Sequence, residues 1–159
     1  MKTIIVVSGE NSTGKSSAIV ALHNSSPYTN VNTIFNNNIN VVAHGNHIGT
    51  GKHLGICSEG DSQQLILKYL LPLIQVNCEV IVCASHGENT QSFKEIERLA
   101  NQNGYAIIKT SNICNYSRTR YTQQNATRKE LHQNLFGSRK LNLNTIFVST
   151  INNLINQVI

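Results

Sequence analysis

The chain has 159 residues, of which 40% are hydrophobic and 13% are charged. This length fits one domain with a sizeable buried core, and the composition excludes an intrinsically disordered chain of high net charge. The formal net charge is +5, but residues 1–108 carry six Lys or Arg against seven Asp or Glu. The positive charge therefore lies in 109–140, where seven basic residues accompany a single acid, Glu130.

Alternating strands and helices are predicted along the first part of the chain. A continuous β-branched run over 2–8 is typical of a strand buried on both faces, and apolar residues at helical spacing follow over 14–26. A polar linker containing Pro27 then leads to a short second strand over 39–45. A third strand, of about four residues, is expected within 53–61, which ends in an acidic turn.

The middle of the chain continues this alternation. A helix is predicted over 61–77, with Asp61 or Ser62 as its N-cap and with Pro72 kinking it or ending its regular part. The apolar run 79–85 is typical of a fourth buried strand.

The last elements carry clear start and stop signals. A further helix is expected to begin at Asn89 or Thr90 and to stop at Gly104, and 105–111 is typical of a fifth strand. The inward positions of this helix would be Phe93, Ile96 and Leu99. The tail 141–159 fits a helix better than a sixth strand. This order predicts an α/β fold, a three-layer αβα sandwich with a five-stranded, mostly parallel sheet.

The distribution of apolar residues and cysteines bears on the compartment. No run approaches the roughly 18 consecutive apolar residues of a membrane span, and we expect neither a signal peptide nor a membrane partner. The four cysteines show no metal-binding spacing. We interpret the abundant asparagines as the coding bias of an AT-rich genome, and expect a cytoplasmic bacterial protein or a viral protein within its host cell.

The segment 9–16, Gly-Glu-Asn-Ser-Thr-Gly-Lys-Ser, matches the pattern G-x-x-x-x-G-K-[ST] at every fixed position, between a predicted strand and a predicted helix. Its glycines allow backbone N–H groups to turn toward phosphate oxygens, and the helix N-terminus adds its dipole. We expect Lys15 to span the β- and γ-phosphates, Ser16 to bind Mg²⁺ and Ser17 to contact the α-phosphate. The other phosphate-binding positions would be Gly9, Asn11, Ser12, Thr13 and Gly14.

With this motif in this context, residues 2–24 resemble the P-loop NTPase superfamily. In size the chain is similar to the small P-loop kinases of nucleosides, nucleotides and small metabolites. The resemblance implies ATP and Mg²⁺ as cofactors, within one P-loop domain over 1–159.

P-loop proteins also hold the metal through an acid at the end of a neighbouring strand. Glu59 and Asp61 are the acids that follow the predicted strand at 53, so either is a candidate metal residue, with Asp61 also a candidate catalytic residue. Helix capping by Asp61 is the alternative. By analogy with small kinases, this strand is expected directly beside the strand 2–8.

The basic segment 111–130 resembles the arginine-bearing lid of small P-loop kinases. Arg118 and Arg120 would then stabilise charge on the transferred phosphoryl group. A solvated basic loop and a nucleic-acid contact, with Tyr116 and Tyr121 stacking on bases, are the alternatives.

Two further groups of polar residues are candidate functional residues. His44 or His47, beside a glycine-rich turn, could act on an acceptor, although the histidines lack the other ligands expected of a zinc site. Ser85, His86 and Glu88 form a polar tip after the fourth strand, at the edge where ligands bind in open α/β sheets.

These observations predict phosphoryl transfer from ATP to a small acceptor such as a nucleoside or nucleotide. No Asp-x-Asp follows the second strand, which leaves the acceptor's base unassigned. The alternative is an ATP-binding or ATP-hydrolysing accessory protein that acts on nucleic acid or a protein partner through its basic C-terminal third. An inactive nucleotide binder is a third interpretation.

Overall fold

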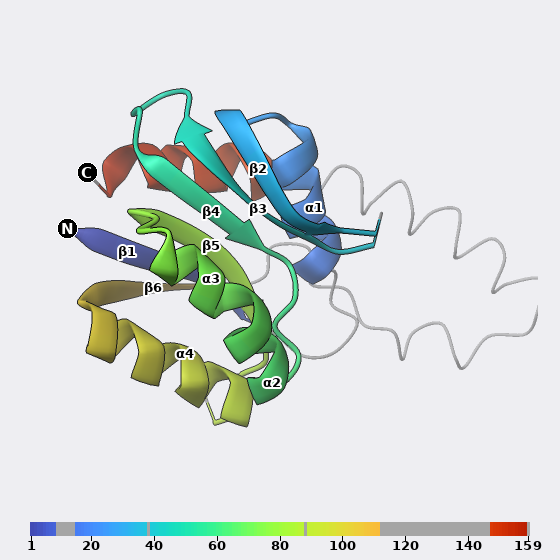
Figure 1. Ribbon diagram of the computed structural model, residues 1–159, viewed down its shortest axis with the longest axis vertical. Coiled ribbons are helices and arrows are strands. Elements are labelled where there is room, and N and C mark those ends of the chain that lie inside the picture. Colours follow the sequence, from blue (N-terminus) through green and yellow to red (C-terminus); the bar gives the residue numbers. More distant parts are fainter. Residues whose placement is uncertain (9–14, 38, 88, 112–146, 159) are drawn as a thin grey trace, which may run out of the picture.

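The computed structural model describes residues 1–8, 15–37, 39–87, 89–111 and 147–158. Within these residues six strands form one sheet in the order β2-β3-β4-β5-β1-β6 (Figure 1). The strands are β1 (Lys2–Ser8), β2 (Tyr28–Asn36), β3 (Val41–His47), β4 (His53–Cys57), β5 (Val80–Ser85) and β6 (Tyr105–Ser111). The helices are α1 (Lys15–Asn24), α2 (Gln63–Leu65), η1 (Ile66–Leu70), α3 (Leu71–Gln75) and α4 (Gln91–Asn103), and 147–157 is also helical.

The sheet is mixed, with a parallel part that contains β4, β5, β1 and β6. β5 and β6 both pair with β1 in parallel, and β4 pairs in parallel with β5. Ser8 lies opposite Ser85 on one side and Ser111 on the other, while Cys57 lies opposite Cys83. The carboxyl ends of these four strands therefore meet along one edge of the sheet, which we call the carboxyl edge.

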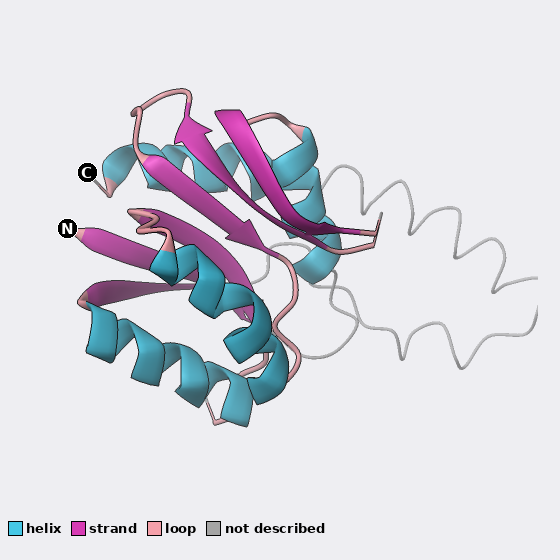
Figure 2. Ribbon diagram, viewed as in Figure 1, coloured by secondary structure: helices cyan, strands magenta, loops and turns pink. Residues whose placement is uncertain are grey.

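Helices cover both faces of the sheet, as Figure 2 shows. On one face α1 and the helical segment 147–157 pack on the sheet, and on the other face α2, η1, α3 and α4 do so. The first interface buries Ile5, Val7, Ile19, Leu22, Val82, Phe147, Ile151 and Ile155. The second buries Ile4, Val6, Leu70, Leu73, Ile81, Phe93, Ile96 and Leu99. The α/β class and the three layers are thus as predicted, and adjacent residues of β1 point into different interfaces, which explains its continuous apolar sequence.

The number and direction of the strands differ from the prediction of five mostly parallel strands. The segment around Pro27, expected as a linker, leads into β2, which pairs antiparallel with β3, and β3 pairs antiparallel with β4. β2 is an edge strand whose residues from 29 to 34 are all exposed. Its backbone pairing with β3 needs no buried side chains, so its polar, asparagine-rich sequence lacks the apolar alternation that identifies a half-buried strand.

The helical stretch 63–75 passes through Pro72 instead of ending there. Its middle turn, η1, is a π-helix, and the N–H of Leu71 bonds to the carbonyl of Ile66, five residues back. Proline has no N–H and its ring crowds the carbonyl four residues before it. We attribute the wide turn to this crowding, because Pro72 lies in the first turn of α3 directly after it.

The caps of α4 and the form of the tail agree with the sequence. Thr90 is the N-cap and accepts a hydrogen bond from the N–H of Phe93, and Gly104 ends the helix with φ of 73°. Residues 147–157 are helical, as favoured for the tail.

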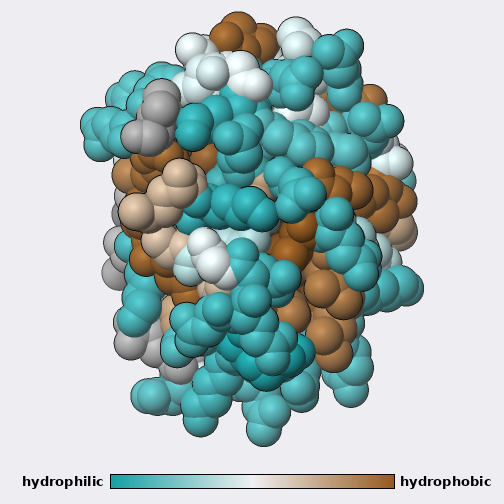
Figure 3. Space-filling view, turned by 60° about the vertical axis from the view of Figure 1, so that its left-hand side comes forward, coloured by the Kyte–Doolittle hydropathy of each residue, from teal (hydrophilic) through white to brown (hydrophobic). Residues whose placement is uncertain are grey.

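The exposed hydrophobic residues are dispersed. On the side drawn in Figure 3, brown hydrophobic areas are interrupted by hydrophilic side chains. The large hydrophobic residues most exposed among the described ones are Met1, Val31, Ile34, Ile39, Ile48, Leu67 and Val76. No helix in the described ranges has the length and hydrophobicity that crossing a membrane requires.

Candidate functional site

The start of α1 carries the last residues of the predicted phosphate-binding motif. Lys15, Ser16 and Ser17 form its first turn, and the preceding strand β1 ends at Ser8 on the carboxyl edge. Lys15 is only 5% exposed. Burial lowers the pKa of its ammonium group, and the nearby Asp61 carboxylate opposes that change. The loop positions Gly9, Asn11, Ser12, Thr13 and Gly14 lie outside the described residues.

Ser16 connects α1 to the loop that follows β4. Its hydroxyl donates a hydrogen bond to the carbonyl of Ser58, at 3.1 Å. Ser58 is itself buried, and its hydroxyl accepts from the N–H of Val41 and donates to Asn40. These bonds fix the first residue of what we call the acidic loop, residues 58–62, between the start of α1 and the start of β3.

The acidic loop also lies directly against the end of β5. A β carbon on Gly60 would stand 1.8 Å from the carbonyl oxygen of Ala84, a distance that no side chain can occupy. Glycine at this position therefore lets the loop backbone touch the neighbouring strand, which brings the residues after β4 and those after β5 together.

The two acids of this loop have different surroundings. Asp61 is exposed, acts electrostatically on Lys15, and lies 3.5 Å from the imidazole Nε2 of His86. The pKa of Glu59 is raised by burial and then by Asp61, against the opposing effect of Lys68. Asp61 is thus the acid associated with the start of α1, whereas Glu59 is influenced by the basic residue of η1.

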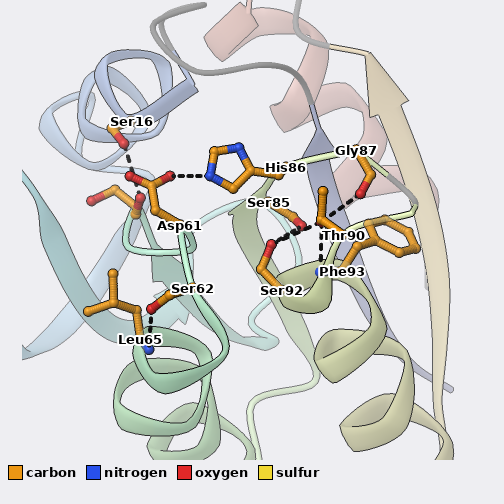
Figure 4. A network of polar contacts seen from close by, with 11 residues as sticks. Ser16, Asp61, Ser62, Leu65, Ser85, His86, Gly87, Thr90, Ser92 and Phe93 are labelled. Carbon is orange, nitrogen blue, oxygen red and sulfur yellow. Dashed lines mark hydrogen bonds and ion pairs between the residues drawn. The ribbon is translucent and has the colours of Figure 1, made fainter.

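Helix capping does not occupy Asp61. The N-cap of the helical stretch is Ser62, whose hydroxyl accepts a hydrogen bond from the N–H of Leu65 at 3.2 Å. Of the two caps considered from the sequence, Ser62 is confirmed, and the Asp61 carboxylate remains turned toward His86 (Figure 4).

The residues that follow β5 form a second polar group at the same edge. Ser85 and Ser92 are buried and their hydroxyls lie 3.2 Å apart, while the hydroxyl of Thr90 donates to the carbonyl of Gly87. His86 extends from this turn to Asp61, as Figure 4 shows. The sequence indicated a polar tip here, but the pairing of Asp61 with His86 depends on strand order and had no local signal.

The order of the strands corrects one further expectation. The acid-ending strand β4 does not lie beside β1, because β5 lies between them and pairs with both. The acidic loop nevertheless approaches α1, since the hydroxyl of Ser16 bonds to the carbonyl of Ser58.

The histidine hypothesis is not supported by the position of β3. Because β3 runs antiparallel to β4, Asn46 lies opposite His53, and His47 with its turn belongs to the edge opposite the carboxyl edge. His44 lies in mid-strand, where its Nδ1 is 2.8 Å from Nε2 of His53. Burial and the neighbouring His53 lower the pKa of His44.

The arrangement at the carboxyl edge combines a buried lysine, a helix N-terminus, a serine hydroxyl and a carboxylate. Cationic and N–H donors suit a polyphosphate, and hard oxygen atoms suit magnesium. Among the described residues, no group of three or more His, Cys, Asp or Glu side chains could hold a metal ion. A magnesium site can be built from one hydroxyl and one carboxylate of the protein, fewer than three such side chains. Mg²⁺ keeps several waters and takes substrate phosphates as its other ligands.

The lid candidates Arg118 and Arg120 lie outside the described residues, as does most of the segment 111–130.

Comparisons of the chain with protein-family models, with curated proteins and with solved structures found no match.

Proposed function

We propose that the chain is a P-loop NTPase that binds ATP with Mg²⁺ and transfers the γ-phosphoryl group to a small acceptor such as a nucleoside or nucleotide. The observation that carries this proposal is that the start of α1, with Lys15 and Ser16, adjoins the acidic loop with Asp61 at the carboxyl edge of the parallel part of the sheet. The motif G-x-x-x-x-G-K-[ST] lies between a buried strand, β1, and a helix, α1, which is the context that phosphate binding requires.

Each residue has a role that follows from its position. Lys15 would bind the β- and γ-phosphates, and the hydroxyl of Ser16 and the carboxylate of Asp61 would hold magnesium. On sequence grounds alone, the segment 9–14 is proposed to bind the phosphates through its N–H groups. Magnesium supplies neutralising charge to the phosphate oxygens when bound. Asp61 is preferred over Glu59 for this role because Asp61 is the acid that acts on Lys15.

In the transfer, the bond between the γ-phosphorus and the oxygen bridging to the β-phosphate breaks, and a bond to the acceptor's hydroxyl oxygen forms. ADP leaves, and the hydroxyl proton passes to solvent or to a base. Arg118 and Arg120 are proposed to stabilise charge on the group in transfer, on sequence grounds alone.

The test is incubation with ATP radiolabelled at the γ-phosphate, against a panel of nucleosides, nucleotides and polynucleotides. Label transfer to a small acceptor supports the proposal, and hydrolysis alone favours the accessory-protein alternative. If neither label transfer nor hydrolysis occurs, the result contradicts catalysis and favours an inactive nucleotide binder.

A lysine pair supplies the matched binding control. Lys15→Ala should weaken ATP binding about tenfold or more, because it removes a charged hydrogen-bond donor to phosphate. Lys52 also follows a glycine, but it lies before β4 at the opposite edge, in an ion pair with Glu79. Lys52→Ala should therefore bind ATP as wild type does, and equal affinity in the two variants would contradict the proposal.

The second candidate function, an ATPase that acts on nucleic acid, is favoured by the concentration of basic residues in 109–140. It predicts polynucleotide binding that weakens with salt and with Arg118→Ala, together with ATP hydrolysis stimulated by the polynucleotide. The kinase proposal predicts that Arg118→Ala lowers turnover and leaves retention on a DNA column unchanged.

A further inference from the structure

We propose that His86 is a positioning residue, which holds the Asp61 carboxylate in the orientation that magnesium requires. The proposal rests on the function proposed above and adds a residue to which the sequence assigned no such role. Its basis is the approach of His86 Nε2 to Asp61 Oδ1, at 3.5 Å, between two loops that follow different strands (Figure 4).

The Asp61 side chain needs such a partner because it is 63% exposed. Ser62 caps the helical stretch in its place, so capping does not fix the carboxylate. Among the described residues, His86 forms an ion pair with Asp61, and Lys15 is also attracted to its carboxylate electrostatically. An exposed carboxylate without a partner would sample several rotamers, and ordering it on magnesium would oppose binding.

His86 is suited to this task because its own position is fixed. Its side chain is 19% exposed and it directly follows Ser85, a fully buried residue of β5. The turn after it is closed by two hydrogen bonds to the carbonyl of Gly87, from the hydroxyl and from the N–H of Thr90. The histidine is therefore presented from a strand end and a closed turn.

The two loops are also fixed relative to each other. The backbone of Gly60, the residue before Asp61, lies against the carbonyl oxygen of Ala84, which is two residues before His86. This close approach places the acidic loop directly against the end of β5, so the backbone brings the carboxylate and the imidazole to the same place.

The chemistry of the pair leaves Asp61 able to bind metal. A carboxylate has two oxygen atoms with about four lone pairs, so a donor at Oδ1 leaves Oδ2 for magnesium or for one of its waters. Partners outside the metal's own ligands commonly orient those ligands, and losing one typically costs about 10–100-fold in metal affinity or activity. His86 would act in this way on Asp61.

Three substitutions of His86 separate a directed donor from general packing. Gln can present its amide nitrogen near the place of the imidazole Nε2, whereas the amide nitrogen of Asn lies near the place of Nδ1. His86→Gln should therefore keep a donor close to the Asp61 carboxylate, while His86→Asn and His86→Ala should not. A role in packing alone would rank Asn and Gln alike.

The measurement is ATP binding by calorimetry, titrated with Mg²⁺ and repeated in EDTA. His86→Ala and His86→Asn should raise the Mg²⁺ concentration that gives half-maximal strengthening of ATP binding about tenfold or more, while His86→Gln should stay near wild type. Binding in EDTA should be the same in all four proteins. A wild-type Mg²⁺ requirement in His86→Ala, or equal requirements in the Asn and Gln variants, would overturn the inference.

The controls distinguish this inference from the function on which it rests. If wild type binds ATP and loses it with Lys15→Ala, an unchanged His86→Ala refutes the role of His86 alone. If wild type binds no ATP, both proposals fail. Should His86→Ala not fold, as judged by circular dichroism, the Asn and Gln variants still give opposite expectations.

Discussion

Gly60→Ala tests whether the contact between the acidic loop and β5 is as tight as the structure shows. The new β carbon would stand 1.8 Å from the Ala84 carbonyl oxygen and 2.6 Å from its carbon. Real β carbons essentially never approach a heavy atom within 3.0 Å, so the backbone must move by at least 1.2 Å, the difference between 3.0 and 1.8 Å. Ala84 belongs to a strand paired on both sides, so the acidic loop has to move.

The size of the effect follows from what that movement breaks. Overpacking a filled site costs about 1–3 kcal/mol, and we expect the upper end because both clashing partners are backbone. The same movement would displace Asp61, the residue directly after Gly60, from its place beside His86. Gly60→Ala should therefore lower the unfolding free energy by about 3 kcal/mol and weaken Mg²⁺-dependent ATP binding.

Urea unfolding followed by circular dichroism measures the first effect, with Gly87→Ala as the matched control. Gly87 lies in the neighbouring loop at the same edge, but a β carbon there would meet nothing within 4 Å. That variant should stay within about 0.5 kcal/mol of wild type. If Gly60→Ala is equally mild, the close approach of the loop to β5 is refuted.

Three further predictions concern α4 and its surroundings. Thr90→Ala removes the N-cap bond to Phe93 and should lower the unfolding free energy by about 1 kcal/mol in urea titration. Gly104→Ala forces alanine to adopt φ of 73° and should lower the thermal midpoint through a loss of about 1 kcal/mol, and an unchanged midpoint would contradict the left-handed cap. The pKa of Glu95 is lowered by its hydrogen bonds from Arg98, and also by Gln63, against the effect of burial. The contribution of the Glu95 carboxylate to the unfolding free energy is complete above the unfolded-state pKa of about 4.3, and it is lost as pH falls through the lower pKa of the folded state. Wild type should therefore lose more resistance to urea on acidification than Glu95→Gln does.

The strands buried on both faces and the helix caps could be predicted because their signals are local. β1 and β5 are continuous apolar runs, and Thr90 and Gly104 have the residue types that start and stop a helix. The motif around Lys15 is likewise read from residue spacing alone. These features depend on neighbours in sequence, so no knowledge of the sheet order is required.

The remaining features depend on which strands become neighbours. β2 is held by backbone bonds to β3 and has few buried side chains, so its sequence resembles a polar linker. The proximity of Asp61 to His86 arises only because β4 and β5 pair. These two side chains are 25 positions apart in sequence, and no periodic pattern indicates a contact over such a separation.

The position of β5 between β1 and β4 explains why the acid associated with Lys15 comes late in its loop. Adjacent strands lie about 4.8 Å apart, so the end of β4 is about 10 Å to the side of β1. A carboxylate at Cys57, the last residue of β4, would therefore be far from the start of α1. Asp61 lies four residues farther along, after a glycine whose missing side chain lets the loop lie against the end of β5. The order Gly60-Asp61 thus brings a carboxylate of β4 back toward the helix that begins after β1, and explains why Asp61, and not Glu59, acts on Lys15.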